Sequence, residues 1–317
     1  MAPAQRLIVV LATVLAWTMA ASPAQPSAAT RPGPSPVLYG ITIDEVGHLE
    51  EIVGSLATLP YRPTTRVYFD AQQPAQYYAP ALAQIHGVSG VMGELLDSSE
   101  EKAISTVAFA QRVRSYVSLL APNVDIWEIG NEVNGNWTGP YATVSAKLTA
   151  AYEEVTAAEA KTALTFYANN FAKNNCGDGP AELTPVQFAQ QYVPAQVANG
   201  LDYVFLSYYP TQCRHTEPSS VDLAAYLTQL HVLFPNAALG FGEVGLPHHA
   251  SRGSAAKAAQ IMSWAYALNP GLPYYVGGYF WWYGAQDALR AAAPLAGALK
   301  EAFTEEHAAL GQAAQTG

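Results

Sequence analysis

Two glutamates that follow apolar stretches have the residue type and setting of a catalytic pair. Glu132 follows the stretch Val124 to Ile129 after a Gly-Asn step. Glu243 follows the stretch Ala237 to Phe241 after a single glycine. Such stretches are typical of buried parallel strands, which deliver the next side chain to their C-terminal end. Hydrolysis of an acetal needs one acid and one base or nucleophile, and two carboxyl groups in unlike environments can divide these roles. The alternative for each glutamate is a strand-end charge paired with an arginine.

Eight short apolar segments that alternate with longer helical segments would position this pair. We expect strands at Val37 to Ile43, Thr65 to Phe69, Val88 to Glu94, Val124 to Glu132, Leu164 to Ala168, Tyr203 to Tyr208, Ala238 to Glu243 and Tyr275 to Trp281. We expect helices at Val46 to Ala57, Pro74 to Ile85, Ser98 to Leu120, Tyr141 to Lys161, Pro185 to Ala198, Ser220 to Phe234, Ser254 to Leu268 and Pro294 to Leu310. In the third of these, Ser98 is interpreted as the N-cap, with acidic residues in the first turn. Strands too apolar to face water, each followed by a helix, predict an α/β fold of the (β/α)8 TIM-barrel type.

An open, doubly wound sheet is the alternative fold, because alternation alone does not prove that the sheet closes. The closed barrel is favoured because the unusual residues fall at or just after the strand ends, which form one ring in a barrel. These residues are Asp44, Asp70, Glu94, Glu132, Asn169, Tyr209, Glu243 and Trp282.

The charge of the chain argues against nucleic acid or an anionic membrane surface as a partner. Lys and Arg number 15 against 25 Asp and Glu, which gives a formal net charge of −10, and no basic block is present. Charged residues make up 13% of the chain, compared with about 25% in a typical soluble domain. We therefore expect a surface that relies on small and uncharged polar residues.

The N-terminal segment has the features of an export signal. Arg6 supplies the positive region, Leu7 to Ala16 the apolar core, and Thr18-Met19-Ala20 or Ser27-Ala28-Ala29 a cleavage site. We expect residues 1–29 to be the signal peptide and lead-in, residues 30–36 a linker, and residues 37–317 a single catalytic domain. The predicted location is secreted or periplasmic, with no membrane attachment after signal cleavage, and the predicted state is a monomer.

Cys176 and Cys213 are the two cysteines of the chain. In an exported protein such a pair is typical of a disulfide, and two free thiols are the alternative. The bond would join the loops that follow the fifth and sixth expected strands.

Other site chemistries find little support. Gly240 to Gly245 matches G-x-G-x-x-G, but Pro247 and a polar stretch separate it from the next helix, so no helix N-terminus is offered to a pyrophosphate. The adjacent His248 and His249 have no third ligand spaced nearby. No cofactor and no metal ion are therefore expected.

Together these segments resemble the clan A glycoside hydrolases, which are retaining enzymes on (β/α)8 barrels. The resemblance rests on Trp127 to Asn134 (WEIGNEVN), which contains Asn131-Glu132, and on Glu243 at the end of the seventh strand. Arg66, Tyr208 and Trp281 lie near the places where that clan has an Arg, a Tyr or His, and a Trp. Leu206 to Pro210 is reminiscent of family 53 galactanases, and the neighbours of Glu243 are reminiscent of family 17 glucanases, but we assign no family.

The resemblance implies a role for each residue. Glu243 would be the nucleophile and Glu132 the acid/base, with their carboxyl groups about 5 to 5.5 Å apart. The pKa of Glu132 would be raised by burial and by the charge of Glu243. Arg66 and Tyr208 would keep Glu243 ionised, and Asn131 would bind the sugar 2-hydroxyl. Trp281, or alternatively Trp282, would form the apolar floor under the sugar. Trp137, Tyr209 and Tyr283 would flank the cleft.

The expected activity is hydrolysis of a β-linked polysaccharide or oligosaccharide. A carbohydrate-binding barrel without catalysis is the alternative.

Glu128, four residues before Glu132, is expected to point into the barrel, where it would need a partner such as Arg66.

Overall fold

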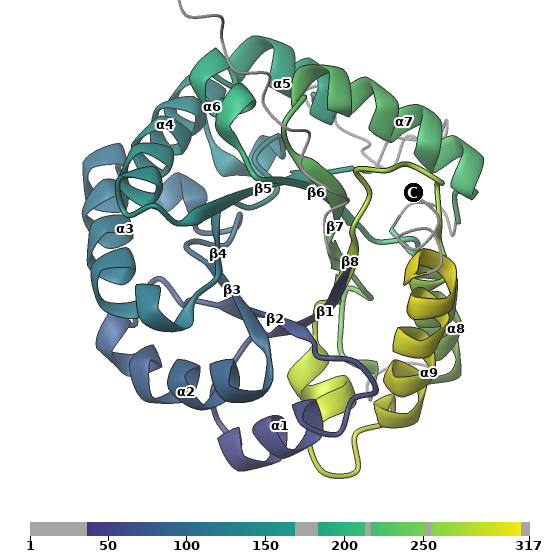
Figure 1. Cartoon of the computed structure of the whole chain (residues 1–317). Coiled ribbons are helices and arrows are strands. Elements are labelled where there is room, and N and C mark those ends of the chain that lie inside the picture. Colours follow the sequence, from purple (N-terminus) through teal and green to yellow (C-terminus); the bar gives the residue numbers. More distant parts are fainter. Residues whose placement is uncertain (1–36, 169–182, 213–216, 251–254, 312–317) are drawn as a thin grey trace, which may run out of the picture. The chain divides into compact units, whose positions relative to one another are not determined.

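The computed structural model describes residues 37–168, 183–212, 217–250 and 255–311, and these form a closed barrel of eight parallel strands (Figure 1). The strands are β1 (Leu38–Ile43), β2 (Thr64–Tyr68), β3 (Gly90–Glu94), β4 (Ile126–Gly130), β5 (Lys161–Tyr167), β6 (Tyr203–Tyr208), β7 (Ala238–Val244) and β8 (Gly277–Trp281). They pair in sequence order, and β8 closes the ring against β1. The predicted TIM barrel is confirmed.

Helices surround the strands on the outside of the ring (Figure 1). They are α1 (Leu49–Leu56), α2 (Ala75–Val88), α3 (Thr106–Leu120), α4 (Tyr141–Ala157), α5 (Pro185–Tyr192), α6 (Ala195–Gly200), α7 (Ser220–Leu233), α8 (Ala255–Tyr266) and α9 (Ala296–Glu306). The single helix expected at Pro185 to Ala198 is divided at Pro194, because proline lacks an N–H and keeps the preceding residue extended.

The start of α3 differs from the prediction in a way that matters for the site. The N-cap is Ser105, whose side chain accepts a hydrogen bond from the backbone N–H of Ala108. Residues 95–100 instead form a loop, followed by a short 3₁₀ turn at Glu101–Ala103. Ser98 is therefore not a helix cap, and its side chain is available for other contacts.

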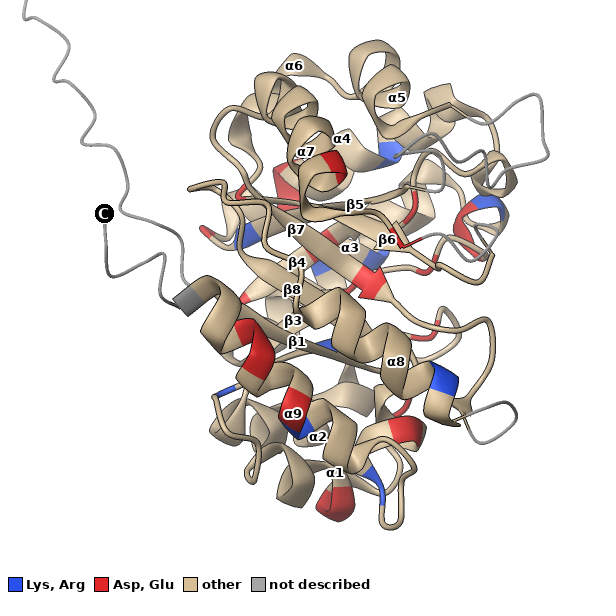
Figure 2. Cartoon of the chain, turned by 90° about the vertical axis from the view of Figure 1, so that its right-hand side faces the viewer, with Lys and Arg blue, Asp and Glu red and all other residues tan. Residues whose placement is uncertain are grey.

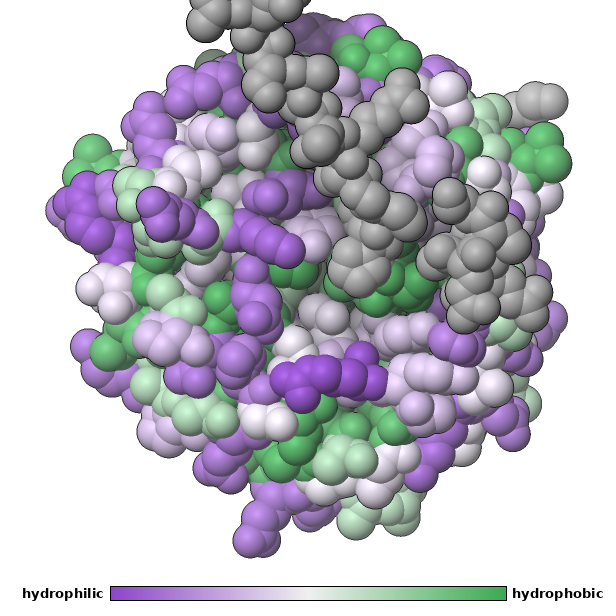
Figure 3. Space-filling model, in the orientation of Figure 1, coloured by the Kyte–Doolittle hydropathy of each residue, from purple (hydrophilic) through white to green (hydrophobic). Residues whose placement is uncertain are grey.

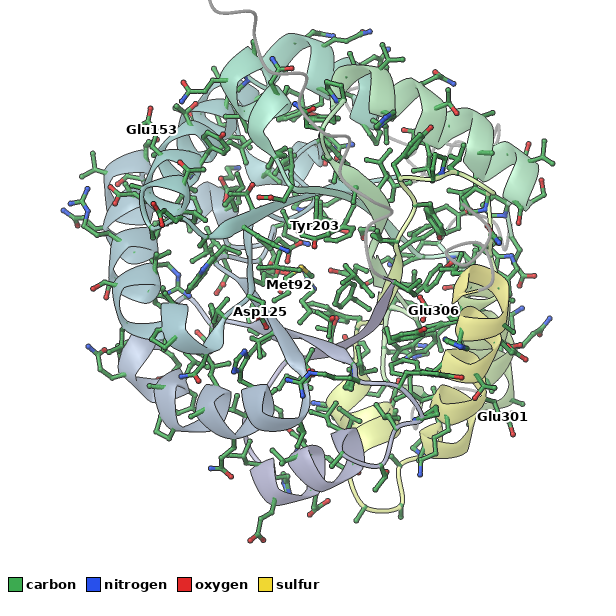
Figure 4. All side chains as sticks on the ribbon, viewed as in Figure 1. Met92, Asp125, Glu153, Tyr203, Glu301 and Glu306 are labelled. Carbon is green, nitrogen blue, oxygen red and sulfur yellow. The ribbon has the colours of Figure 1, made fainter. Side chains whose placement is uncertain are left out.

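Two hydrophobic layers support the barrel. The larger lies between strands and helices, and the smaller fills the interior near the N-terminal ends of the strands. Met92 and Tyr203 of this inner layer are labelled within the ring in Figure 4. Because apolar side chains occupy that end, the polar residues of the interior collect at the C-terminal ends of the strands.

A β-bulge precedes each of the two glutamates. The pairing of β4 with β5 shifts between Glu128 and Gly130, and the pairing of β6 with β7 shifts so that Gly242 is skipped. A Cβ at Gly130 would lie 2.6 Å from Leu148 Cδ2, and a Cβ at Gly242 would lie 2.7 Å from Thr165 Oγ1. Only glycine fits these two positions without displacing its neighbours, and bulges at barrel rims redirect the side chains that follow.

The surface agrees with the low content of charged residues. On the face shown in Figure 3, hydrophilic residues are interrupted by pale and hydrophobic ones. In Figure 2, Lys and Arg are scattered, and those of the described residues form no continuous patch on the side shown. Within the described ranges, no helix is both long and apolar enough to cross a bilayer. Asn169, Cys176 and Cys213 lie outside the described residues, so the disulfide stays a prediction.

Candidate active site

A pocket of about 420 Å³ lies at the C-terminal ends of the strands. Its lining consists of Asp97, Ser98, Ser99, Glu132, Trp137, Tyr167, Tyr209, Gln212, Glu243, Leu246, Pro247, Trp282 and Tyr283. Glu132 and Glu243, predicted as a pair from sequence, both line this pocket although 111 residues separate them in the chain. Trp137, Tyr209 and Tyr283, which were expected to flank the cleft, line it too.

Glu132 is held in an uncommon backbone conformation two residues after β4. Its φ angle is 44°, in the left-handed region, where a residue with a side chain typically costs about 1 to 3 kcal/mol. Its carboxyl group is buried, with the hydroxyl of Ser207 at 2.5 Å from Oε1 and that of Ser98 at 2.9 Å from Oε2. Two neutral hydroxyl groups thus hold the carboxyl group of Glu132 in place, and no cation among the described residues forms a direct bond to it.

Glu243 has a different environment. Nη1 of Arg66 donates to its Oε2 at 3.1 Å, and Nδ2 of Asn131 donates to the same oxygen at 3.4 Å. The phenol of Tyr209 donates to its Oε1. A cation, an amide and a phenol therefore surround this carboxylate, and all three favour its charged form.

Arg66 is shared by three carboxyl groups. Besides Glu243, its Nε donates to Oε2 of Glu128 at 2.6 Å, and its Nη2 lies 3.1 Å from Oε1 of Glu94. The other oxygen of Glu128 accepts a hydrogen bond from Thr165. The predicted pairing of Glu128 with Arg66 is confirmed. Burial alone would lower the pKa of Arg66, but Glu128, Glu94 and Glu243 outweigh it and raise the pKa well above its usual value.

The two pocket glutamates hold their protons with different strengths. Burial, together with the charge of Glu243, raises the pKa of Glu132 to about 8, although its bonds to Ser207 and Ser98 act in the opposite direction. Burial also raises the pKa of Glu243, but Arg66 and Tyr209 oppose it and leave the pKa at about 7. The two groups interact and titrate as a pair. Arg66 and Tyr209 favour the charged form of Glu243, whereas only neutral hydroxyl groups contact Glu132, so this arrangement favours Glu132 as the protonated member of the pair.

The structure corrects the position expected for Tyr208. This side chain points out of the barrel, and its ring centroid lies 6.2 Å from that of Trp264 in α8. The contact with Glu243 expected of Tyr208 is made by Tyr209. Successive residues of a strand point to opposite faces, and in β6 the inward set is Tyr203, Phe205 and Ser207. Tyr209 continues this inward set.

Trp281 is likewise displaced from its expected role. It is fully buried, and its Nε1 donates to Oδ2 of Asp287 at 2.9 Å, away from the pocket lining. Trp282, the alternative considered from sequence, lines the pocket, and the centroid of its ring lies 5.3 Å from the guanidinium carbon of Arg66. Trp281 therefore cannot form the floor beneath a bound sugar, whereas Trp282 can.

Sequence reasoning missed the two serines beside Glu132. The local pattern around Ser98 predicts a helix cap, and Ser207 lies unmarked within the segment Leu206 to Pro210. The period of two in β6 could have identified Ser207, because it shares the inward face with Phe205. Of the acidic residues on the expected ring, Glu94 is buried against Arg66, and Asp70 accepts a hydrogen bond from the backbone N–H of Gln72. Asp97, three residues after Glu94, lines the pocket.

No protein-family model matches the chain, and no curated protein sequence matches it. Among solved structures, a GH10 xylanase from Bispora sp. MEY-1 with xylobiose is similar, at 15% identity and a TM-score of 0.54, covering 83% of this chain and 95% of that one. Xylanase 10B from Thermotoga maritima is 11% identical with a TM-score of 0.53, covering 84% of this chain and 94% of that one.

A GH5-4 broad specificity endoglucanase from an uncultured bacterium is also similar, at 11% identity and a TM-score of 0.59, covering 83% of this chain and 86% of that one. All three are named as glycoside hydrolases, but identities this low show the fold alone. The resemblances to family 53 galactanases and family 17 glucanases stay predictions.

Proposed function

We propose that the protein is a secreted retaining glycoside hydrolase that cleaves β-linked polysaccharide or oligosaccharide through a glycosyl-enzyme intermediate. The observation that carries the proposal is the pair Glu132 and Glu243 in one pocket with unlike partners. Glu132 has the more strongly raised pKa and suits the acid, whereas Glu243 is bonded to a cation and suits the nucleophile.

In the first step, a carboxylate oxygen of Glu243 attacks the anomeric carbon, and the bond from that carbon to the leaving oxygen breaks. Glu132 gives its proton to the leaving oxygen, so the departing sugar leaves as a neutral alcohol. The products are a glycosyl ester on Glu243 and an ionised Glu132. Because the ester carries no charge, the repulsion that raised the pKa of Glu132 falls, and Glu132 becomes a base.

In the second step, Glu132 takes a proton from a water molecule, and the resulting hydroxide attacks the anomeric carbon. The ester bond to Glu243 breaks, which restores its carboxylate and the proton of Glu132. Two displacements at the same carbon give net retention of its configuration.

The neighbouring residues have roles that follow from their positions. Asn131, which donates to Glu243 in the free protein, is placed to bind the 2-hydroxyl of the sugar that is attacked. Trp282 lines the pocket beside Arg66 and offers a flat apolar face to a pyranose ring. Arg66 and Tyr209 stabilise the charge that returns to Glu243 when the ester breaks.

The substrate class is supported by the solved structures of similar fold. Two of them are xylanases, one with xylobiose, and a third is a broad specificity endoglucanase. Xylan and β-glucans are therefore the first substrates to test, followed by galactans, mannans and exopolysaccharides.

The decisive experiment compares the wild type with Glu243→Gln and Glu132→Gln on this panel. We expect the wild type to release sugars and Glu243→Gln to lose at least about 10⁴-fold in rate, as removal of a nucleophile typically does. Glu153→Gln is the matched control, because Glu153 is exposed on α4 (Figure 4). NMR of the first product should show the same anomeric configuration as the substrate. Binding without turnover on every substrate would instead favour the carbohydrate-binding barrel.

A high-resolution crystal structure adds an independent check. Retention requires the carboxyl groups of Glu132 and Glu243 to lie about 5 to 5.5 Å apart, whereas inversion requires about 6.5 to 9.5 Å. A separation in the larger range would refute the double displacement.

Secretion rests on the sequence features of residues 1–29. Expression of the full chain should place the mature protein outside the cytoplasm, and N-terminal sequencing should locate the cleavage site. A cytoplasmic product that retains Arg6 would contradict the export signal.

A further inference from the structure

Ser98 stands at the meeting point of three elements that surround the pocket. It is buried in the loop between β3 and α3. Its backbone N–H donates to Oδ1 of Asn131 at 3.1 Å, and its hydroxyl donates to Oε2 of Glu132 at 2.9 Å. Its hydroxyl oxygen accepts from Nε1 of Trp137 at 3.0 Å. One small residue therefore contacts the acid, the amide beside the nucleophile, and an aromatic ring of the pocket wall.

The indole of Trp137 fixes the direction of one of these hydrogen bonds. An indole N–H can only donate, so the oxygen of Ser98 accepts from Trp137 and keeps its single hydrogen for Oε2 of Glu132, to which it donates. Oε2 is thereby an acceptor, and the proton of the neutral acid belongs on Oε1. Oε1 faces Ser207, whose hydroxyl can accept as well as donate. The proton that is given to the substrate is thus confined to one of the two oxygens.

The loop that carries Ser98 is anchored from outside the pocket. Lys147 of α4 is buried, donates to the backbone oxygen of Glu101, and lies 3.1 Å from Oε1 of the same residue. This buried ion pair fixes the 3₁₀ turn that follows Ser98. Asn131 adds a second restraint, because the bond from Ser98 leaves its Nδ2 directed toward Glu243.

Trp137 lies on the side of the pocket that the leaving group must occupy. The acid has to reach the leaving oxygen, and Trp137 approaches Glu132 through Ser98, whereas Trp282 lies at Arg66 near the nucleophile. Trp137 packs edge-on against Tyr167, with ring centroids 5.0 Å apart, and both rings line the pocket. A sugar on this side would therefore contact the ring whose N–H orients Ser98.

We propose that Ser98 is a positioning residue that couples Trp137, on the leaving-group side of the pocket, to the acid Glu132. The inference rests on the proposed glycoside hydrolysis. Ser98 itself does not touch the reacting atoms. It keeps the acid proton on Oε1, the oxygen that does not accept from Ser98, and Trp137 keeps Ser98 in the orientation that does so.

If Ser98 acts through the acid Glu132, the rate loss caused by removing its hydroxyl should depend on how much the leaving group needs protonation. An aryl glycoside with a 2,4-dinitrophenyl group departs without protonation, whereas one with an unsubstituted phenyl group needs the acid. We expect Ser98→Ala to lose about 10- to 100-fold on the phenyl glycoside, part of the contribution of a general acid, and little on the dinitrophenyl glycoside. Ser98→Thr keeps the hydroxyl and should recover most of the loss.

The pH profile gives a second readout that a purely structural role would not move. The groups that face Glu132 are Glu243 from β7, Asp97 from the loop after β3, Tyr209 after β6, and the hydroxyls of Ser207 and Ser98. The bond from Ser98 favours the charged form of Glu132, so its removal raises the pKa of Glu132. The basic limb of kcat/KM for Ser98→Ala should shift to higher pH.

A double-mutant cycle tests the coupling to Trp137. Trp137→Phe removes the N–H and keeps an aromatic ring, and we expect a loss of about 10-fold or less on the phenyl glycoside. Because the N–H acts through Ser98, the double variant should be no slower than Ser98→Ala alone. Ser118→Ala, exposed on α3, and Trp264→Phe, which packs outside the barrel, are the matched controls.

The outcomes separate this inference from the proposed function. The coupling would be wrong if Ser98→Ala lost the same fold in rate on both aryl glycosides, or if its loss and that of Trp137→Phe were additive in the double variant. Either result would leave the proposed hydrolysis by the wild type unaffected. No wild-type turnover of any glycoside would overturn the proposed function and this inference with it. If Ser98→Ala fails to fold, as judged by its thermal transition, the leaving-group dependence of Trp137→Phe decides alone.

Discussion

Nη1 of Arg66 lies 3.1 Å from Oε2 of Glu243, and the same guanidinium also pairs with Glu128 and Glu94. A single buried cation thus contacts three carboxyl groups inside the barrel, and burial still raises the pKa of one of them, Glu94, well above its usual value. The ionised state of Glu243 depends on this sharing, because burial by itself raises the pKa of Glu243.

Removal of Arg66 should destabilise the protein strongly. Arg66→Ala leaves buried carboxyl groups without their cation, which typically costs about 3 to 5 kcal/mol. We expect the loss at pH 7 in urea unfolding, and a smaller loss at pH 4, where protonation removes the uncompensated charges. Arg114→Ala is the control, because Arg114 pairs with Glu154 at the surface and should change stability little. Similar results for both variants would contradict the central role of Arg66.

Activity should be confined to a narrow pH range. Hydrolysis requires the pair to carry one proton, so kcat/KM should rise as the pair loses its first proton and fall as it loses its second, and both apparent pKa values should lie above the usual value of a glutamate. Glu243→Gln removes a negative charge beside Glu132 and should lower the pKa of Glu132, which carbon-13 NMR of the glutamate side chains can follow. An unchanged Glu132 titration in this variant would show that the two carboxyl groups are not coupled.

Tyr208 and Tyr209, at the C-terminal end of β6, should differ in how much the rate of hydrolysis falls when each loses its hydroxyl group. Tyr209→Phe removes a hydrogen bond to the charged Glu243, and we expect a rate loss of about 10- to 100-fold. Tyr208→Phe alters a side chain that packs outside the barrel against Trp264, so its rate should stay close to that of the wild type. The reverse order would mean that β6 is rotated by one residue in solution.

Glu306 provides a test of pH-dependent stability away from the pocket. It is buried in α9 beside β8 (Figure 4), and burial raises its pKa well above the usual value. Above the usual pKa of a glutamate the unfolded chain has lost this proton while the folded protein keeps it, so the unfolded state binds fewer protons and stability falls as pH rises.

Glu306→Gln is neutral at every pH and should remove this contribution. Between the two pKa values, the wild type should lose about 1.4 kcal/mol per pH unit more than the variant. Urea unfolding from pH 5 to pH 8 measures the difference, and hydrolysis should be unchanged. Parallel stability curves would show that Glu306 is ionised in the folded protein.

The sequence by itself predicted the architecture and the candidate catalytic pair. Eight apolar segments with helices between them predict a parallel sheet covered by helices, and the unusual residues at the strand ends favoured the closed barrel that the structure shows. Glu132 and Glu243 were found because each lies one or two residues beyond such a segment, and in a barrel all strand ends meet at one rim. Glu128 was placed correctly beside Arg66 by the same reasoning.

Tertiary structure alone decided which face each neighbouring residue presents. Tyr209 rather than Tyr208, and Trp282 rather than Trp281, reach the pocket, and a shift of one residue reverses such a choice. That shift depends on pairing between strands, which includes the bulge at Gly242. Ser98 reaches Glu132 from another loop. No local pattern reports a contact of this kind, because it exists only once the barrel has closed.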